Sequence, residues 1–204
     1  MAPTASAPAR ARTAAHSSDR HGRTTKQRIL TAAEQVVLRD GVGHLTLDAA
    51  AAEAGLSKGG ILYHYPTRDS LVAAMVDRII DQFEHDIDRH LPEAGSPEAG
   101  LPGAYARAYV RATVEPAAAG EERLGAALLA AAAAEPALLV PLQRAAEGWQ
   151  ARMVEDGLDP ALATVIRMAC DGLWMCDLFG LASPKGALRA SVGAAFDEMT
   201  RAVP

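Results

Sequence analysis

Glycine and proline residues divide this sequence into segments of helical length, and this division constrains the fold more than any other feature. Proline cannot donate the hydrogen bond that continues a helix, and glycine readily adopts the left-handed conformation in which helices end. The segments between these residues predict helices over about residues 24–40, 46–54, 58–64, 67–90, 102–115, 121–134, 137–156, 160–181 and 185–202.

The residue composition favours helices over β-sheets. Alanine, the best helix former, is the most frequent residue, and only 4% of residues are aromatic. A strand needs a run of β-branched and aromatic residues, and the one candidate, residues 42–47, is short and interrupted by Gly43. The sequence therefore predicts an all-α fold of about nine helices, with 50% apolar residues to fill a sizeable core.

Two of the predicted helices, 46–54 and 58–64, are short and are separated by a turn that contains Gly55. This arrangement predicts a helix-turn-helix over residues 46–65. Alanines on the first helix allow the second helix to approach closely, and Gly55 can supply the positive φ of a sharp turn. An ordinary hairpin of two helices is the alternative interpretation.

The outward residues of the second short helix suit contact with nucleic acid. Gly59 and Gly60 each cost roughly 1 kcal/mol relative to alanine in a helix interior, but they let another surface approach the backbone. Lys58 can donate hydrogen bonds to guanine or phosphate, and Tyr63 and His64 can donate to phosphate oxygens. The sequence therefore predicts a DNA-binding surface on this helix.

The run Gly-Leu-Ser-Lys-Gly-Gly-Ile-Leu-Tyr-His-Tyr, residues 55–65, resembles the DNA-binding domain of the TetR family of transcriptional repressors. The resemblance extends over about residues 24–84. In that family the third helix lies in the major groove and the start of the fourth helix contacts the DNA backbone. The resemblance implies base contacts from Ser57, Lys58, Gly59 and Gly60, phosphate contacts from Tyr63, His64, Thr67 and Arg68, and positions beside the groove for Thr24, Lys26 and Thr46.

Two residues depart from the pattern of that family. Leu62 stands where many members have an aromatic residue, and we expect this change to alter packing only. Gly60 stands where many members have a hydroxyl or amide side chain. Because glycine lacks that side chain, a possible base contact is missing, so recognition is expected to depend more on the shape of the DNA.

Charge is distributed unevenly along the chain. Residues 1–28 have a net charge of +5, whereas the chain from Leu71 onward has a net charge of −8. This asymmetry indicates a basic end that meets a polyanion. Residues 1–22 lack apolar periodicity and are expected to form a disordered arm, either as a solvated tail or in the minor groove. The expected domains are residues 23–84, for DNA binding, and residues 85–204, joined to the first by the long fourth helix.

The larger domain is expected to supply a dimer. One helix-turn-helix contacts one half-site, so a palindromic or near-palindromic operator calls for a homodimer with half-sites about 34–36 Å apart or a multiple of that distance. The last two predicted helices carry a line of small residues, Gly172, Cys176 and Gly180, that permits close helix approach. The resemblance to TetR repressors also implies dimerisation through the last two helices.

The larger domain is also expected to enclose a pocket for an unidentified, largely apolar small-molecule effector, because many alanines leave room around few large side chains. Such an effector would release the operator by favouring a different spacing of the two fourth helices. The candidate lining residues are Tyr105, Arg107, Tyr109, Trp149, Met153, Asp171, Trp174, Met175 and Phe179.

No sequence pattern points to catalysis, a metal site or a cofactor. The sequence has no glycine-rich phosphate loop, nucleophile elbow or HExxH motif, and no ligand partner at suitable spacing from His64. Cys170 and Cys176 point in different directions on one helix, so they are expected to be buried apolar residues rather than a disulfide or a redox sensor. Without a signal peptide or a spanning segment, the protein is expected to be cytoplasmic.

The sequence thus favours a DNA-binding transcriptional regulator, most simply a ligand-responsive repressor, over an enzyme. One alternative is a regulator without an effector. Another is a helical ligand-binding or interaction protein that has lost its DNA function.

Overall fold

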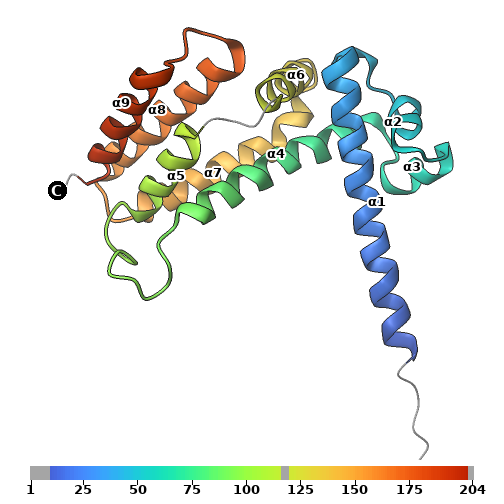
Figure 1. Ribbon diagram of the computed structural model, residues 1–204, viewed down its shortest axis with the longest axis horizontal. Coiled ribbons are helices and arrows are strands. Elements are labelled where there is room, and N and C mark those ends of the chain that lie inside the picture. Colours follow the sequence, from blue (N-terminus) through green and yellow to red (C-terminus); the bar gives the residue numbers. More distant parts are fainter. Residues whose placement is uncertain (1–9, 116–119, 202–204) are drawn as a thin grey trace, which may run out of the picture. The chain divides into compact units, whose positions relative to one another are not determined.

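A computed structural model describes residues 10–115 and 120–201, and its regular secondary structure is entirely helical in this part of the chain (Figure 1). The all-α prediction is confirmed, and the strand candidate forms the 3-10 helix η1 and the start of α2. The elements are α1 (Arg10–Asp40), η1 (Val42–His44), α2 (Leu47–Ala54), α3 (Lys58–His64), α4 (Arg68–His90), α5 (Ala104–Val114), α6 (Glu121–Ala134), η2 (Pro136–Leu139), α7 (Val140–Glu155), α8 (Pro160–Phe179) and α9 (Gly186–Met199).

The first helix begins much earlier than predicted. The sequence predicts a disordered arm over residues 1–22, whereas α1 runs from Arg10. Residues 10–22 include several alanines and arginines, which are good helix formers, and extending an existing helix avoids the cost of nucleation. The prediction is therefore wrong for residues 10–22, and residues 1–9 lie outside the described part of the chain.

Contacts among the helices divide the chain into two units. Unit 1 ends at Leu71 and unit 2 begins at Val72, so the division falls earlier in α4 than the predicted boundary after residue 84. The reason is the packing of the middle of α4. Ile80 and Ile87 are buried in the same core as residues of α5, α7 and α8.

Unit 1 is built by α1 packing on α2 and by α2 packing on α3. Ala50 and Ala51 are buried and allow the close approach that the sequence predicts. Arg28 of α1 donates a hydrogen bond to the carbonyl of Ala54 at 2.9 Å, and Arg39 pairs with Glu53 at 2.8 Å. The buried apolar residues of this unit include Ile29, Ala32, Ala33, Val36, Val37, Leu45, Ala50, Ala51, Ile61, Tyr65 and Leu71.

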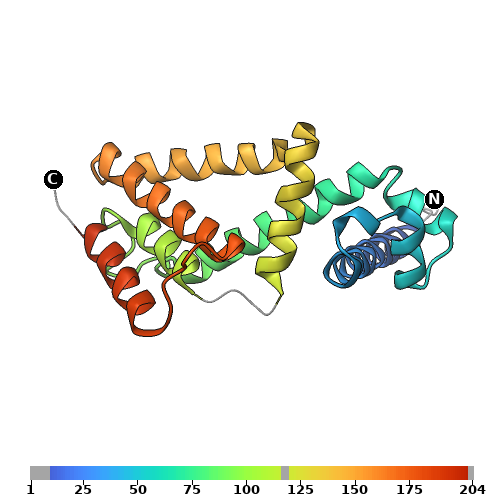
Figure 2. The same cartoon turned by 90° about the horizontal axis from the view of Figure 1, so that it is seen from above.

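Unit 2 is organised around α8, which packs against α5, α6, α7 and α9 (Figure 2). Its core contains an aromatic group from three helices, in which the rings of Phe83, Tyr109 and Trp149 meet edge to face with centroids about 5–6 Å apart. Such pairs add stability beyond the area they bury. One close approach requires glycine: a side-chain carbon at Gly103, where φ is 78°, would lie 2.3 Å from the backbone carbonyl oxygen of Thr200.

Side chains from distant segments bind both ends of α5. At its start, the carboxylate of Asp156 accepts hydrogen bonds from the backbone amides of Tyr105 and Ala106, at 2.9 and 2.8 Å. At its end, Arg189 of α9 donates to the carbonyls of Thr113 and Val114, at 3.2 and 2.8 Å. These bonds satisfy backbone groups that the helix itself leaves unpaired.

Arg189 also forms an ion pair with Asp177 at 2.9 Å, and both side chains are only about 15% exposed. We predict that Arg189→Ala lowers the free energy of unfolding by about 2–3 kcal/mol, because it leaves a mostly buried carboxylate and two carbonyls without their partner. Urea denaturation followed by circular dichroism measures this loss.

The matched control is Arg201→Ala, which removes an arginine that pairs with Asp197 but is 57% exposed. Exposed ion pairs contribute little to the free energy of unfolding, so the control should change it by less than about 1 kcal/mol. Equal losses for the two variants would show that the Arg189 cluster does not hold α5 and α9 together.

Candidate nucleic-acid interface and effector region

The turn between α2 and α3 has the geometry that the sequence predicts. Gly55 has a φ of 64° and a ψ of 37°, the left-handed conformation that glycine adopts without strain. The amide of Leu56 donates to the carbonyl of Ala51 at 2.9 Å, which closes the end of α2. Thr46 begins α2, where its hydroxyl accepts from the amide of Ala49 at 3.0 Å.

The first turn of α3 is capped by Ser57, whose hydroxyl accepts from the amide of Gly60 at 3.2 Å. The side of α3 that carries Ile61 is buried, and the opposite side is exposed. Tyr63 is 86% exposed, and its ring meets that of His64 edge to face. Leu62, expected only to pack, is 39% exposed, so it belongs to the outer surface of the helix.

Neither glycine of α3 is required by its neighbours within the chain. A side-chain carbon at Gly59 would meet nothing closer than the hydroxyl of Ser57 at 4.0 Å, and one at Gly60 would make ordinary contacts. The backbone at these positions is therefore open to an approaching surface.

Lys58 has a partner that the sequence analysis missed. Its ammonium lies 3.1 Å from the carboxylate of Asp48 on α2, and both side chains are about two thirds exposed. An exposed pair of this kind contributes little to stability, so the lysine can exchange this partner for phosphate or a base edge. The only sequence signal for Asp48 is its place in the first turn of α2.

Thr67 and Arg68, at the start of α4, make contacts within unit 1. The Thr67 hydroxyl accepts from the amide of Ser70 at 3.0 Å, and the Ser70 hydroxyl accepts from the amide of Thr67 at 3.2 Å. This reciprocal pairing resembles a capping box, and a serine three residues after a threonine was its sequence signal. Arg68 donates to the carbonyls of Val42 and Leu45, rather than pointing freely into solvent.

Thr24 and Lys26 are exposed on α1. Thr24 borders a hollow of about 370 Å³ between α1 and the end of α2, together with Gln27, Arg28, Thr31, Ala32, Gln35, Glu53 and Ala54. The structure thus brings Thr46, Ser57, Lys58, Gly59, Gly60, Tyr63, His64, Thr67 and Arg68 together on three consecutive elements of unit 1. Thr24 and Lys26 lie on the helix that packs against α2.

The residues predicted to line an effector pocket divide into two groups. Tyr105, Tyr109, Trp149 and Met153 are buried in the core of unit 2, with Arg152 stacked over the ring of Tyr105. By contrast, Trp174, Met175 and Phe179 are between 36% and 45% exposed. These two groups therefore do not line one common space in this structure.

Polar residues accompany the buried aromatic group. The hydroxyl of Tyr109 donates to Asp171 at 2.8 Å, and Asp171 also pairs with Arg167. Burial raises the pKa of Tyr105 to about 12, and its hydroxyl has no hydrogen-bond partner in the described part of the chain. Arg107 donates instead to the backbone carbonyls of Pro102 and Thr200, at the start of α5.

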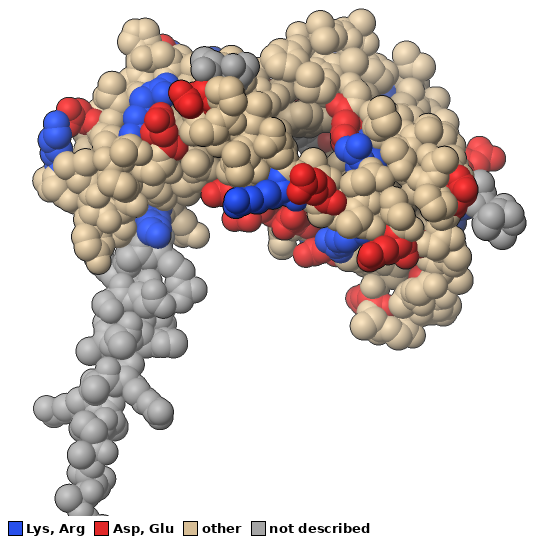
Figure 3. Space-filling view, turned by 180° about the vertical axis from the view of Figure 1, so that it is seen from behind, with Lys and Arg blue, Asp and Glu red and all other residues tan. Residues whose placement is uncertain are grey.

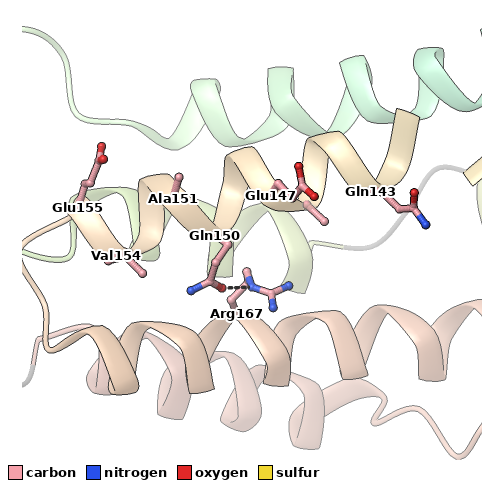
Figure 4. A pocket seen from close by; sticks show the side chains of 8 residues that line it. Gln143, Glu147, Gln150, Ala151, Val154, Glu155 and Arg167 are labelled. Carbon is pink, nitrogen blue, oxygen red and sulfur yellow. Dashed lines mark hydrogen bonds between the residues drawn. The ribbon is translucent and has the colours of Figure 1, made fainter. Parts of the chain in front are cut away.

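A hollow of about 530 Å³ lies between α7 and α8 (Figure 4). Arg167 reaches across it from α8 and donates to Gln150 of α7. None of the predicted pocket residues lines this hollow, and the one aromatic side chain of α7, Trp149, is buried in the core. Its lining is Gln143, Ala146, Glu147, Gln150, Ala151, Val154, Glu155 and Arg167.

Unit 2 carries the excess of acidic residues that the sequence contains from Leu71 onward. Figure 3 shows many Asp and Glu side chains on the face drawn, with Lys and Arg side chains between them. Partial burial, and then the charge of Asp81, raise the pKa of Asp77 above its usual value. Such a surface repels a polyanion.

Among the described residues, no cluster of His, Cys, Asp and Glu is suited to hold a metal ion, and none of the described helices could span a membrane.

Two family models match most of the chain. Residues 29–75 match the model for bacterial regulatory proteins of the tetR family, which includes the helix-turn-helix. Residues 103–201 match the model for the tetracyclin repressor-like C-terminal domain, which includes α5 to α9.

Solved structures share this fold over nearly their whole length. The multidrug binding protein EbrR, in complex with malachite green, is 29% identical, with a TM-score of 0.64 over 88% of this chain and 98% of that chain. A TetR family member from Streptomyces coelicolor A3 is 25% identical, with a TM-score of 0.69 over 86% and 98%. A transcriptional regulator from Rhodococcus sp. Rha1, at 18% identity, a TM-score of 0.67 and coverage of 88% and 99%, shares the fold.

The two cysteines differ in their surroundings, which leads to a prediction about their reactivity. Burial raises the pKa of the Cys170 thiol from 9.0 to about 12, so its thiolate fraction at pH 8 falls about a thousandfold. We predict that Cys170 in a Cys176→Ser variant reacts with a disulfide reagent at pH 8 at least about a thousandfold more slowly than in the same chain unfolded in urea. Reaction at comparable rates would show that Cys170 is accessible as a redox sensor.

Proposed function

This chain belongs to the TetR family of bacterial transcriptional regulators, and we propose that it is a repressor that a small-molecule effector releases from its operator. The observation that carries this proposal is the exposed outer surface of α3, with Lys58 and Tyr63 beside two unobstructed glycines. A fold that needed α3 only for packing would have no use for this surface. The protein would act in the cytoplasm, on chromosomal DNA.

In the proposed complex, α3 enters the major groove. Ser57, Lys58, Gly59 and Gly60 face the bases at its first turn. Lys58 leaves Asp48 to contact guanine or phosphate, and the glycines bring the backbone close to the base edges. The phosphate contacts fall to Tyr63, His64 and Thr67, with Thr24, Lys26 and Thr46 beside the groove.

The proposed homodimer forms through α8 and α9. Val165, Met168, Met175 and Phe179 recur on α8 at helical spacing and are between 41% and 60% exposed, with the exposed Gly172 among them. Leu188 of α9 is 62% exposed. An exposed apolar stripe on adjacent helices is the expected surface of a helix-bundle interface, and Gly172 permits close approach of the partner.

The proposed effector is a largely apolar small molecule that binds in unit 2. EbrR, which matches this chain over both units, is a multidrug binding protein, and its ligands include malachite green. The aromatic group of Phe83, Tyr109 and Trp149 offers stacking surfaces, and the unpartnered hydroxyl of Tyr105 offers a hydrogen bond. Because these side chains are packed together, we infer that an effector must move some of them.

This need for rearrangement supplies a mechanism of release. An effector that binds the rearranged unit 2 more tightly shifts the population toward it, by no more than its difference in affinity for the two states. A change in α4, which spans both units, would then alter the spacing of the two recognition helices in the dimer.

We predict that Lys58→Ala weakens binding to a duplex that the wild-type protein selects from a randomised library, by about 5- to 100-fold, with loss of sequence preference. Fluorescence anisotropy with the selected duplex and a scrambled one measures both quantities. The control is Lys185→Ala, which removes an exposed lysine at the start of α9 and should change neither. Selection of no sequence by the wild-type protein would favour a helical interaction protein without DNA function.

We also predict that Met168→Asp combined with Met175→Asp converts the dimer to a monomer. Burying four carboxylates in an apolar dimer interface should weaken association at least about a hundredfold. Sedimentation velocity measures the change. Val154→Asp, on the exposed surface of α7, is the matched control and should remain dimeric. A dimer that survives the double substitution would place the interface elsewhere.

A further inference from the structure

Arg68 is the residue of unit 1 whose contacts differ most from the phosphate role that the resemblance implies. It lies at the first position of α4 and its side chain is partly buried. Its Nε donates to the carbonyl of Leu45 at 2.9 Å, and its Nη2 donates to the carbonyl of Val42 at 3.1 Å. Both acceptors lie more than twenty residues earlier in the chain, in the connection between α1 and α2.

These two bonds join two helix starts that carry the proposed DNA contacts. Leu45 immediately precedes Thr46, which caps α2, and Arg68 immediately follows Thr67, which caps α4. The helix-turn-helix is the chain between these two points. The guanidinium therefore closes the segment from Leu45 to Arg68 into a loop and holds the beginning of α2 beside the beginning of α4.

The geometry commits one edge of this guanidinium to the backbone. Nε and Nη2, which form that edge, are directed at fixed carbonyls, and Nη1 lies 3.8 Å from the carboxylate of Asp69. A phosphate contact through this edge would require Arg68 to give up both bonds, whereas Lys58 has only a solvent-exposed partner to leave. A planar, bidentate donor suits two carbonyls better than a flexible ammonium does.

We propose that Arg68 is a positioning residue, which sets the placement of α2 and α3 relative to the start of α4 by binding the carbonyls of Val42 and Leu45. This inference rests on the proposed function of unit 1 as an operator-binding domain. Because α4 continues into unit 2, a change in α4 would be transmitted to the recognition helix through these two hydrogen bonds.

The test compares Arg68→Ala and Arg68→Lys with the wild-type protein, at a temperature where circular dichroism shows every chain fully folded. The probe is the duplex that the wild-type protein selects, with a scrambled duplex alongside, and affinity is measured between about 50 and 200 mM salt. Arg89→Ala, in unit 2, is the control for loss of an arginine. If Arg68→Ala does not fold, Arg68→Gln replaces it, since its amide can still reach one carbonyl.

We expect Arg68→Ala to bind the selected duplex at least about tenfold more weakly, with a reduced preference over the scrambled duplex and an unchanged salt dependence. Arg68→Lys should recover less than half of the loss in log K, because it keeps the charge but not the fork. A phosphate contact would instead lower the salt slope by about 0.9 in Arg68→Ala, and Arg68→Lys would restore binding.

Two further results would overturn the inference. If folded Arg68→Ala binds as tightly and as selectively as the wild-type protein, Arg68 serves stability alone. If the wild-type protein selects no sequence, the operator-binding function fails first, and the role of Arg68 fails with it. The wild-type selection therefore separates failure of the proposed function from failure of this inference.

Discussion

Backbone groups at helix ends are the constraint on which this structure depends. Every helix leaves amides at its start and carbonyls at its end without an internal partner. In this protein, side chains from distant segments bind several of them: Arg28 at the end of α2, Asp156 at the start of α5 and Arg189 at its end. Arg68 does the same for the carbonyls that precede α2. These bonds hold short, alanine-rich helices whose apolar faces bury little area.

Alanine contributes to the architecture in two ways. In unit 1, Ala50 and Ala51 bring α1, α2 and α3 close enough that a helix of only seven residues can be held with its outer surface exposed. In unit 2, small residues leave the core to a few large rings, which gather around Phe83 and Trp149. The same composition therefore gives close helix contacts in unit 1 and a core with few large side chains in unit 2.

Much of the fold could be predicted from sequence because its signals are local. Proline and glycine end helices through their own backbone geometry, so Gly55, Pro66 and the residues before α8 could be recognised without a structure. The start of α1 was misjudged, because low hydrophobicity argues against burial and not against continuing a helix. The partners of Lys58 and Arg68 could not be predicted, since hydrogen bonds between residues far apart in the chain leave no periodic pattern.

The sequence by itself determined the helical class, the helix-turn-helix and the membership that its motif suggests, since turn chemistry, capping and residue spacing act over a few residues. Only the tertiary structure decided which side chains are available. It buried Tyr109 and Trp149 in a packed core, exposed Met168 and Phe179 on α8, and directed Arg68 to backbone carbonyls. Whether a side chain is buried, exposed or already hydrogen-bonded depends on which distant parts of the chain pack against each other.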